Sequence, residues 1–124
     1  PPPPPAPTAA SFSPSAVTTQ LAAAKPVLVI FTADWCLTCK ANEQLVLHTP
    51  KVQQLLRQYG VVSLVADWTR YDPTITAELN RFGARGVPLY VLYLPDGRQH
   101  VFPALISHRL IANTLQQLWE TPAP

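Results

Sequence analysis

The chain has 124 residues, of which 48% are hydrophobic and 13% charged, so it is long enough for one domain with a buried core. Its net charge of +2 comes from scattered residues, without a basic face interleaved with aromatic side chains, and we expect no nucleic-acid partner. Its apolar runs, such as residues 27–31, are far shorter than the about 20 residues that a membrane-spanning helix needs.

Proline dominates the beginning of the chain. Half of the first fourteen residues are Pro, and most of the others are Ala, Ser or Thr. Such a segment favours extended polyproline II and cannot bury enough apolar surface to fold alone. We interpret residues 1–14 as a semi-rigid tether rather than a ligand for a proline-recognising module, residues 15–120 as the folded domain, and residues 121–124 as a tail. Because the chain starts at Pro1 without an initiator Met, we expect it to be a piece of a longer or processed protein.

Strands and helices alternate after the tether. The predicted strands are apolar and β-branched runs, and they cover residues 27–33, 61–66, 89–94 and 98–102. The predicted helices cover residues 15–24, 36–47, 50–60, 73–83 and 108–119. Two of these helices begin with a capping residue followed by Pro, at Thr49-Pro50 and Asp72-Pro73, and Ser107 caps the last one.

This order of elements predicts the fold class. Residues 27–33 form a continuous run of apolar and β-branched residues, which is typical of a strand buried on both faces. Strands that alternate with helices favour a parallel core, and the hairpin at residues 89–102 adds an antiparallel edge. The sequence therefore predicts a three-layer α/β fold, with a mixed central sheet and helices on both faces.

The chain has two cysteines, Cys36 and Cys39, separated by two residues. Zinc usually takes four protein ligands, and the three histidines of the chain lack the spacing of a second ligand pair, so we expect no metal site. A purely structural disulfide would close a very short loop and constrain the unfolded chain little. Both alternatives therefore explain the pair less well than a redox function.

The redox interpretation gains support from the surrounding sequence. A strand that ends near Thr32 and a helix that begins near Cys36 would place that thiol at a helix N-terminus, which favours the thiolate. Cys39 would lie one turn deeper, within disulfide reach, as a resolving thiol does. Trp35 precedes the pair and either shields it with an apolar face or packs into the core.

The combination of "ADWCLTCK" with "GVPLY" some fifty residues later resembles the thioredoxin superfamily, from about Phe12 to Trp119. Within that superfamily, "FTADWCLTCKANE", "VADWT" and "GVPLYVLY" are most similar to the C-terminal periplasmic domain of DsbD-type thiol:disulfide interchange proteins, including the ScsB-like branch. The resemblance implies a thioredoxin-like fold, a periplasmic location and a monomeric domain without a cofactor. It also implies a membrane-embedded electron donor on the same polypeptide, and a periplasmic thiol protein or N-terminal domain as the acceptor.

The same resemblance implies roles for individual residues. Cys36 would be the nucleophile and Cys39 the resolving cysteine of a protein-disulfide reductase. The Val87-Pro88 bond would be cis and would lie beside the disulfide, where Val87 offers backbone hydrogen bonds to an incoming partner strand. Two alternatives stay open: an oxidase that introduces disulfides, and a non-enzymatic copper-binding module that uses the two cysteines as soft ligands.

One position departs from the family pattern. Many thioredoxins carry a buried Asp six residues before the nucleophile, and this chain has Ile30 there. Asp34 and Glu43 are the carboxylates that remain near the pair in sequence. Glu43, which matches a Glu of the family, is either a solvated helix residue or a group that handles the proton of Cys39 or raises the pKa of the thiol. Asp34 is either a similar group or the cap of the helix.

Two further features complete the site prediction. The residues between the cysteines, Leu37 and Thr38, bring no cation that would stabilise a thiolate, which favours a reductant whose Cys36 pKa is near or above that of a free thiol. The loop that contains Asp67, Trp68 and Arg70 follows a predicted strand and serves either packing and capping or partner docking. We expect the histidines to be surface or cap residues: His48, His100 and His108.

Overall fold

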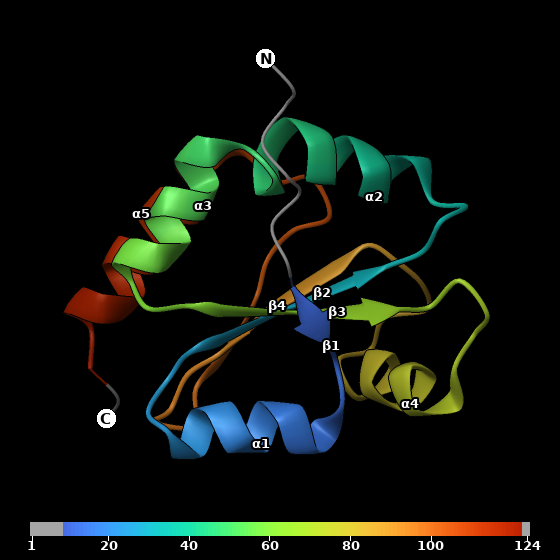
Figure 1. The fold of residues 1–124 in the computed structure, drawn as a ribbon, viewed down its shortest axis with the longest axis horizontal. Helices are drawn as coiled ribbons and strands as arrows, with labels where there is room; N and C mark the ends of the chain where they lie inside the picture. The colour runs from blue at the N-terminus through green and yellow to red at the C-terminus, as the bar shows by residue number, and fades with distance from the viewer. Residues whose placement is uncertain (1–8, 123–124) are drawn as a thin grey trace.

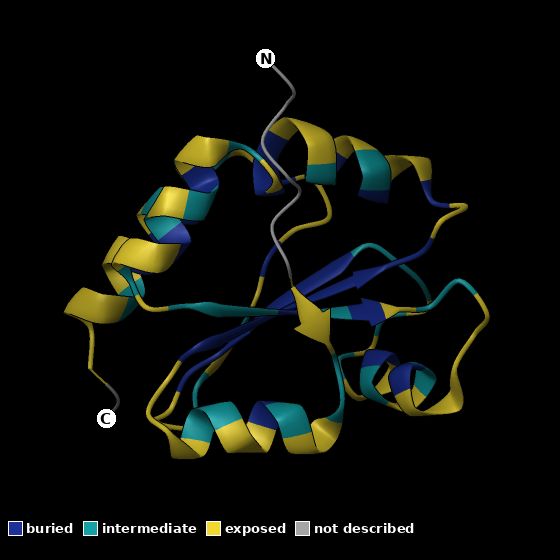
Figure 2. Cartoon of the chain, in the orientation of Figure 1, coloured by how far each residue is buried: buried dark blue, intermediate teal, exposed yellow. Residues whose placement is uncertain are grey.

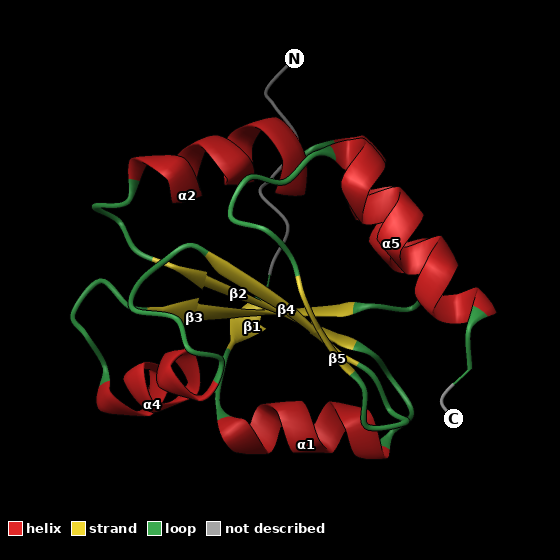
Figure 3. Ribbon diagram, turned by 180° about the vertical axis from the view of Figure 1, so that it is seen from behind, coloured by secondary structure: helices red, strands yellow, loops and turns green. Residues whose placement is uncertain are grey.

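A computed structural model describes residues 9–122 and shows one mixed sheet with helices on both faces (Figure 1). The strands follow the spatial order β1-β3-β2-β4-β5, and their bounds are β1 (Ala10–Ser11), β2 (Val27–Thr32), β3 (Val62–Asp67), β4 (Leu89–Tyr93) and β5 (Gln99–Val101). On one face lie α1 (Pro14–Ala22) and α4 (Pro73–Arg81). On the other face lie α2 (Leu37–Asn42), the π-helical turn η1 (Glu43–Leu47), α3 (Pro50–Gln58) and α5 (His108–Glu120). Figure 3 shows α2 and α5 of this layer with the molecule turned by 180°. The predicted three-layer α/β fold is confirmed.

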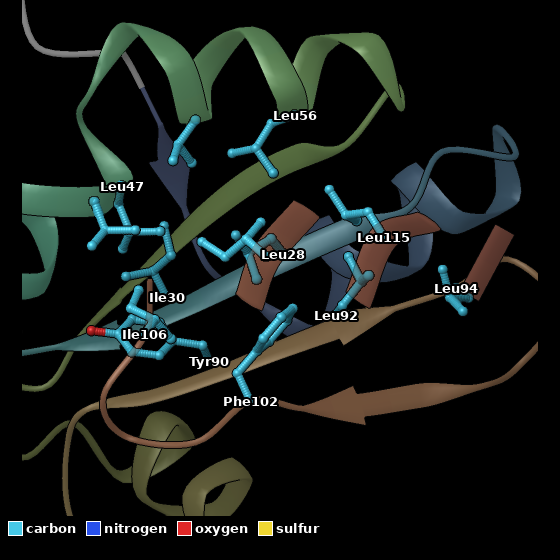
Figure 4. Close-up of a cluster of buried hydrophobic side chains, with 13 residues drawn as sticks. Leu28, Ile30, Leu47, Leu56, Tyr90, Leu92, Leu94, Phe102, Ile106 and Leu115 are labelled. Atoms are coloured by element: carbon cyan, nitrogen blue, oxygen red, sulfur yellow. The ribbon is translucent and has the colours of Figure 1, made fainter. Parts of the chain in front are cut away.

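The central strand β2 is buried along its whole length, as its apolar sequence predicts. It pairs in parallel with β3 and antiparallel with β4, so that Val29 lies opposite both Leu64 and Val91. Because successive side chains point to opposite faces, Leu28 and Ile30 enter the core under α3 and α5 (Figure 4). The alternate residues of β2 enter a second core against α1 and α4. Figure 2 shows the buried strands β2 and β4 between the two half-exposed helical layers.

Capping residues start the helices where the sequence predicts them. Thr49, Asp72 and Ser107 each accept a hydrogen bond from a backbone N–H of the first helical turn, as expected. The first helix begins slightly earlier than predicted, because Ser13 caps it and Pro14 occupies its first turn. Each of these caps fixes the place where the chain enters a helical layer.

The beginning of the chain corrects one expectation. Ala10 and Ser11, which the sequence assigns to the tether of residues 1–14, pair in parallel with β3 as strand β1. The next residue continues the attachment, because the Phe12 N–H donates to Val65 O at 2.8 Å and its ring lies 5.9 Å from that of Phe31. A two-residue strand of small residues has no periodic pattern that sequence analysis could detect. The remainder of the predicted tether and the end of the predicted tail, residues 1–8 and 123–124, lie outside the described residues.

The helix predicted over residues 36–47 changes geometry at its middle. It is α-helical up to Asn42, and then the His48 N–H donates to Glu43 O at 2.8 Å, which closes a π-helical turn. This wider turn lets Val46 and Leu47 both reach the core. No helix within residues 9–122 is long and apolar enough to cross a lipid bilayer.

Candidate redox site

Cys36 and Cys39 form a disulfide at the point where the chain leaves the end of β2 and enters α2, and their Cα atoms are 5.2 Å apart. Cys36 is the N-cap of α2, and its Sγ accepts a hydrogen bond from the Cys39 N–H at 3.1 Å. Cys36 is 8% exposed and Cys39 is fully buried, so the predicted order of depth is confirmed. Because an N–H donor stabilises a negative sulfur, the same contact would favour the Cys36 thiolate in the reduced protein.

A cis peptide bond faces the disulfide from the other side. Val87-Pro88 is cis, as the resemblance implied, and it lies just before β4. The Val87 carbonyl oxygen is 3.8 Å from Cys36 Sγ, and the Val87 side chain packs against Ala33 and both cysteines. The disulfide is therefore enclosed between the first turn of α2 and this backbone segment.

Glu43 is a partly buried residue that is held by two donors, so the solvated alternative is wrong. Its side chain is 13% exposed, and its carboxylate accepts a hydrogen bond from Thr32 Oγ1 at 2.6 Å and lies 3.4 Å from Lys40 Nζ. The Glu43 N–H donates to the carbonyl oxygen of Cys39, one turn earlier in the helix. Ile30, at the position where the family has Asp, is buried in the apolar core. The carboxylate of this site therefore comes from the first residue of η1 instead of from the middle of β2.

Asp34 does not cap the helix, so that interpretation is wrong. Cys36 occupies the cap position, and the Asp34 side chain is 80% exposed, with one oxygen 3.8 Å from Lys40 Nζ. The Asp34 backbone N–H donates to Thr69 Oγ1 at 2.9 Å. Asp34 is therefore a charged residue on the surface beside the disulfide, and its backbone is tied to the loop after β3.

The loop after β3 packs directly against the residues before the disulfide. Trp35 is half-exposed, not a core residue, and its indole N–H donates to Thr69 O at 3.1 Å. Its ring lies 6.0 Å from that of Trp68 and 5.8 Å from that of Tyr71, centroid to centroid. The Trp68 indole in turn donates to Thr76 Oγ1 at 2.7 Å. Packing thus explains Trp68, and the predicted alternative of partner docking stays a prediction.

Two hydrogen-bonded side chains near the site have shifted pKa values. Hydrogen bonds from the Thr69 side chain and backbone hold the pKa of Asp67 below its usual value, so Asp67 is anionic at neutral pH. Burial raises the pKa of Tyr90 to about 12, and the Tyr90 hydroxyl accepts a hydrogen bond from Asn42 Nδ2 at 2.9 Å. The same amide donates to Ala104 O at 2.8 Å, which ties α2 to the loop that precedes α5.

A cavity of about 540 Å³ lies between the sheet and the helices that follow the disulfide. Thr32, Lys40 and Glu43 line it near the site, and the exposed residues Asp34 and Arg57 also line it, so it reaches the surface. The histidines do not gather at the disulfide, because they lie at the end of η1, in β5 and at the start of α5. Within residues 9–122, no three His, Cys, Asp or Glu side chains lie close enough together to hold a metal ion.

Sequence analysis missed three residues of this site. Thr32 is a polar residue at the end of an otherwise apolar strand, and its two-residue separation from Ile30 could have placed it on the same face. Thr69 ties the loop after β3 to Asp34 and Trp35, a contact that has no signature in sequence. Tyr71 adopts a left-handed backbone with φ of 57°, which is uncommon for a bulky residue, and no residue pattern near it indicates this.

Comparison with known proteins agrees with the geometry of the disulfide site. A family model described as thioredoxin-like matches residues 8–95. The thiol:disulfide interchange protein DsbD 1 of Pseudomonas aeruginosa is 37% identical over 75 residues, which is 60% of this chain and 12% of that protein. DsbD of Cronobacter sakazakii is 34% identical over 93 residues, which is 68% of this chain and 16% of that protein. The chain thus spans only 12% to 16% of the length of these curated relatives.

Solved structures agree on the fold. The oxidised C-terminal domain of DsbD from Neisseria meningitidis has a TM-score of 0.69 and 24% identity, over 88% of this chain and 98% of that one. A thioredoxin from Thermus thermophilus has a TM-score of 0.64 and 25% identity, over 90% of this chain and 85% of that one. Both likenesses extend over nearly the whole described part of the chain.

Proposed function

The chain belongs to the thioredoxin-like family, and from that premise we propose that it is a thiol:disulfide oxidoreductase domain that passes electrons by dithiol–disulfide exchange. One observation carries the proposal: the Cys36–Cys39 disulfide lies at the start of α2, with the Val87 carbonyl oxygen 3.8 Å from Cys36 Sγ. A disulfide with a purely structural role needs no backbone segment beside its less buried sulfur. Thiol–disulfide exchange, by contrast, needs one sulfur that a partner can approach.

In the reaction, the reduced domain attacks first through Cys36, the less buried of the two cysteines. Its thiolate attacks a disulfide of the partner, and one partner sulfur leaves as a thiolate while a mixed disulfide forms. Cys39 then attacks the Cys36 sulfur, and the second partner sulfur leaves. Two electrons have passed to the partner, this domain carries the disulfide, and no cofactor is required.

We assign the reductase direction to this exchange. Neither Leu37 nor Thr38 places a cation beside the Cys36 sulfur, and that sulfur accepts its hydrogen bond from a neutral backbone donor, the Cys39 N–H. Strong oxidants of this kind stabilise their reduced form. With less of that stabilisation, the dithiol gives up its electrons more readily.

The similarity to DsbD proteins supports a proposal for the electron donor and the electron acceptor. Because the chain spans only 12% to 16% of those relatives, further domains on the same polypeptide are part of the proposal. We assign the donor role to a membrane-embedded domain of that polypeptide and the acceptor role to a periplasmic thiol protein or N-terminal domain. The isolated domain would be a periplasmic monomer, and Val87 would pair its backbone with the acceptor strand.

The equilibrium reduction potential tests the direction. The oxidised domain is equilibrated with graded mixtures of reduced and oxidised dithiothreitol or glutathione, and the fraction of disulfide is measured by thiol alkylation and mass spectrometry. A reductase should give a potential near that of thioredoxin, about −270 mV, whereas a value near about −120 mV would identify a disulfide-introducing oxidase. A domain that does not equilibrate with either buffer would contradict the exchange function itself.

A further inference from the structure

Thr32 makes a buried hydrogen bond to Glu43 that has no part in the bond-forming steps of the exchange reaction. It is the last residue of β2, is 6% exposed, and lies two residues after Ile30, so both side chains point to the same face of the sheet. Its hydroxyl donates to Glu43 Oε2 at 2.6 Å, a distance typical of a charge-assisted O–H···O⁻ hydrogen bond. A hydroxyl on β2 thus binds the carboxylate on the face where Ile30 supplies no polar group.

This contact ties the carboxylate to β2, on the side of the helix where Cys39 is buried. Cys39 packs against Ala33, the residue that follows Thr32 in the chain. Glu43 follows Cys39 by one helical turn, and side chains at that separation have Cβ atoms about 5–6 Å apart on one helix face. The side chains of Glu43 and Cys39 therefore lie on the same face of the helix, one turn apart.

Lys40 contacts the same carboxylate from the outer side. Its Nζ lies 3.4 Å from Glu43 Oε1 and 3.8 Å from a carboxylate oxygen of the exposed Asp34. Without the Thr32 hydroxyl, the carboxylate of Glu43 would keep its contact with Lys40, whose ammonium group lies toward the surface. The inner position of Glu43 thus depends on Thr32.

We propose that Thr32 is a positioning residue that holds the Glu43 carboxylate where it can take the proton of Cys39. This inference rests on the proposed exchange function. When Cys39 resolves the mixed disulfide, its sulfur must lose a proton and form a bond to Cys36 Sγ as the bond from Cys36 to the partner sulfur breaks. The proton goes to Glu43 and then to solvent through the cavity that Thr32, Lys40 and Glu43 line.

The test separates the two steps of exchange with dithiobis(nitrobenzoate) as the disulfide. Attack by Cys36 on this reagent releases one thionitrobenzoate, and resolution by Cys39 releases the second, so stopped-flow absorbance follows both. The variants are Thr32→Val, which keeps the branched shape and removes the donor; Thr32→Ser, which restores the donor; and Glu43→Gln. Thr114→Val, at a buried threonine of α5, is the matched control.

We expect Thr32→Val to slow the second release about tenfold at about pH 6 and to leave the first release within about twofold. The loss is smaller than the roughly 10²–10⁴-fold effect of a complete general base, because the Glu43 carboxylate is still present. The deficit should close near about pH 9, where hydroxide removes the proton without help. Thr32→Ser should restore the rate, Glu43→Gln should reproduce the loss, and the double variant Thr32→Val with Glu43→Gln should be no slower than Glu43→Gln alone.

Two kinds of result would overturn the inference. A second release in Thr32→Val that matches the unsubstituted protein at all pH values would show that the hydroxyl positions nothing. A loss that is the same at every pH, or that also appears in Thr114→Val, would show a general structural effect. An unsubstituted protein that releases only one thionitrobenzoate would instead contradict the proposed exchange function, on which the inference depends.

Discussion

Replacing Asn42 with Ala removes the side chain that ties the redox helix to the loop before α5. The Asn42 amide is buried, and it donates to Tyr90 Oη at 2.9 Å and to Ala104 O at 2.8 Å. Losing the bond to Ala104 O should cost about 1 kcal/mol, and leaving the buried Tyr90 hydroxyl without this partner should cost about 2 kcal/mol. We therefore expect Asn42→Ala to lower the free energy of unfolding by about 3 kcal/mol, which is about 12 °C in Tm for a domain of this size.

Urea unfolding of the oxidised protein, followed by tryptophan fluorescence and circular dichroism, measures this loss. Tyr90→Phe is the matched control, because it leaves the hydrogen bond from Asn42 to Ala104 O in place. It should lower the free energy of unfolding by only about 1 kcal/mol. The two single variants and the double variant form a cycle whose coupling energy should be about 1 kcal/mol. An Asn42→Ala protein within about 0.5 kcal/mol of the unsubstituted one would refute the inferred role of this amide.

Two other predictions concern charged groups. Burial lowers the pKa of His100, so the unfolded chain binds a proton there more tightly than the folded one. The free energy of unfolding should therefore fall as the pH drops below about 6.5. The His100→Gln variant should flatten this pH dependence in urea titrations, and an unchanged slope would contradict the prediction. Asp72→Ala should lower the free energy of unfolding, measured by thermal unfolding, by about 1 kcal/mol because Asp72 caps α4. Asp34→Ala, at an exposed residue, should change it by less than about 0.5 kcal/mol. Equal losses in the two variants would contradict the cap assignment.

The fold was largely predictable because its main elements have strong local signals. The apolar run of β2 and the pairs Thr49-Pro50 and Asp72-Pro73 each determine structure within a few residues. Strand β1 escaped prediction because Ala10 and Ser11 become a strand only through pairing with β3. The π-helical turn η1 was not predicted for a similar reason. Val46 and Leu47 pack into the core at this turn, and local helix propensity carries no information about such packing.

The candidate site divides in the same way. The CxxC spacing and the family resemblance placed Cys36, Cys39 and the cis Val87-Pro88 bond correctly. The surroundings of the two carboxylates depend on contacts between distant segments. Glu43 is held by a residue eleven positions earlier, and the backbone of Asp34 is tied to one thirty-five positions later. Sequence proximity to the cysteines made the two acids look equivalent, and tertiary packing makes one partly buried and the other exposed.

The central claim is that Cys36 attacks and Cys39 resolves, and covalent trapping tests it most directly. Reduced Cys39→Ala and Cys36→Ala proteins are incubated with oxidised glutathione and analysed by intact-mass spectrometry. We predict that Cys39→Ala accumulates one bound glutathione on Cys36, whereas Cys36→Ala stays largely unmodified because Cys39 is fully buried. Faster or equal modification of Cys39 in the Cys36→Ala protein would contradict the assigned roles.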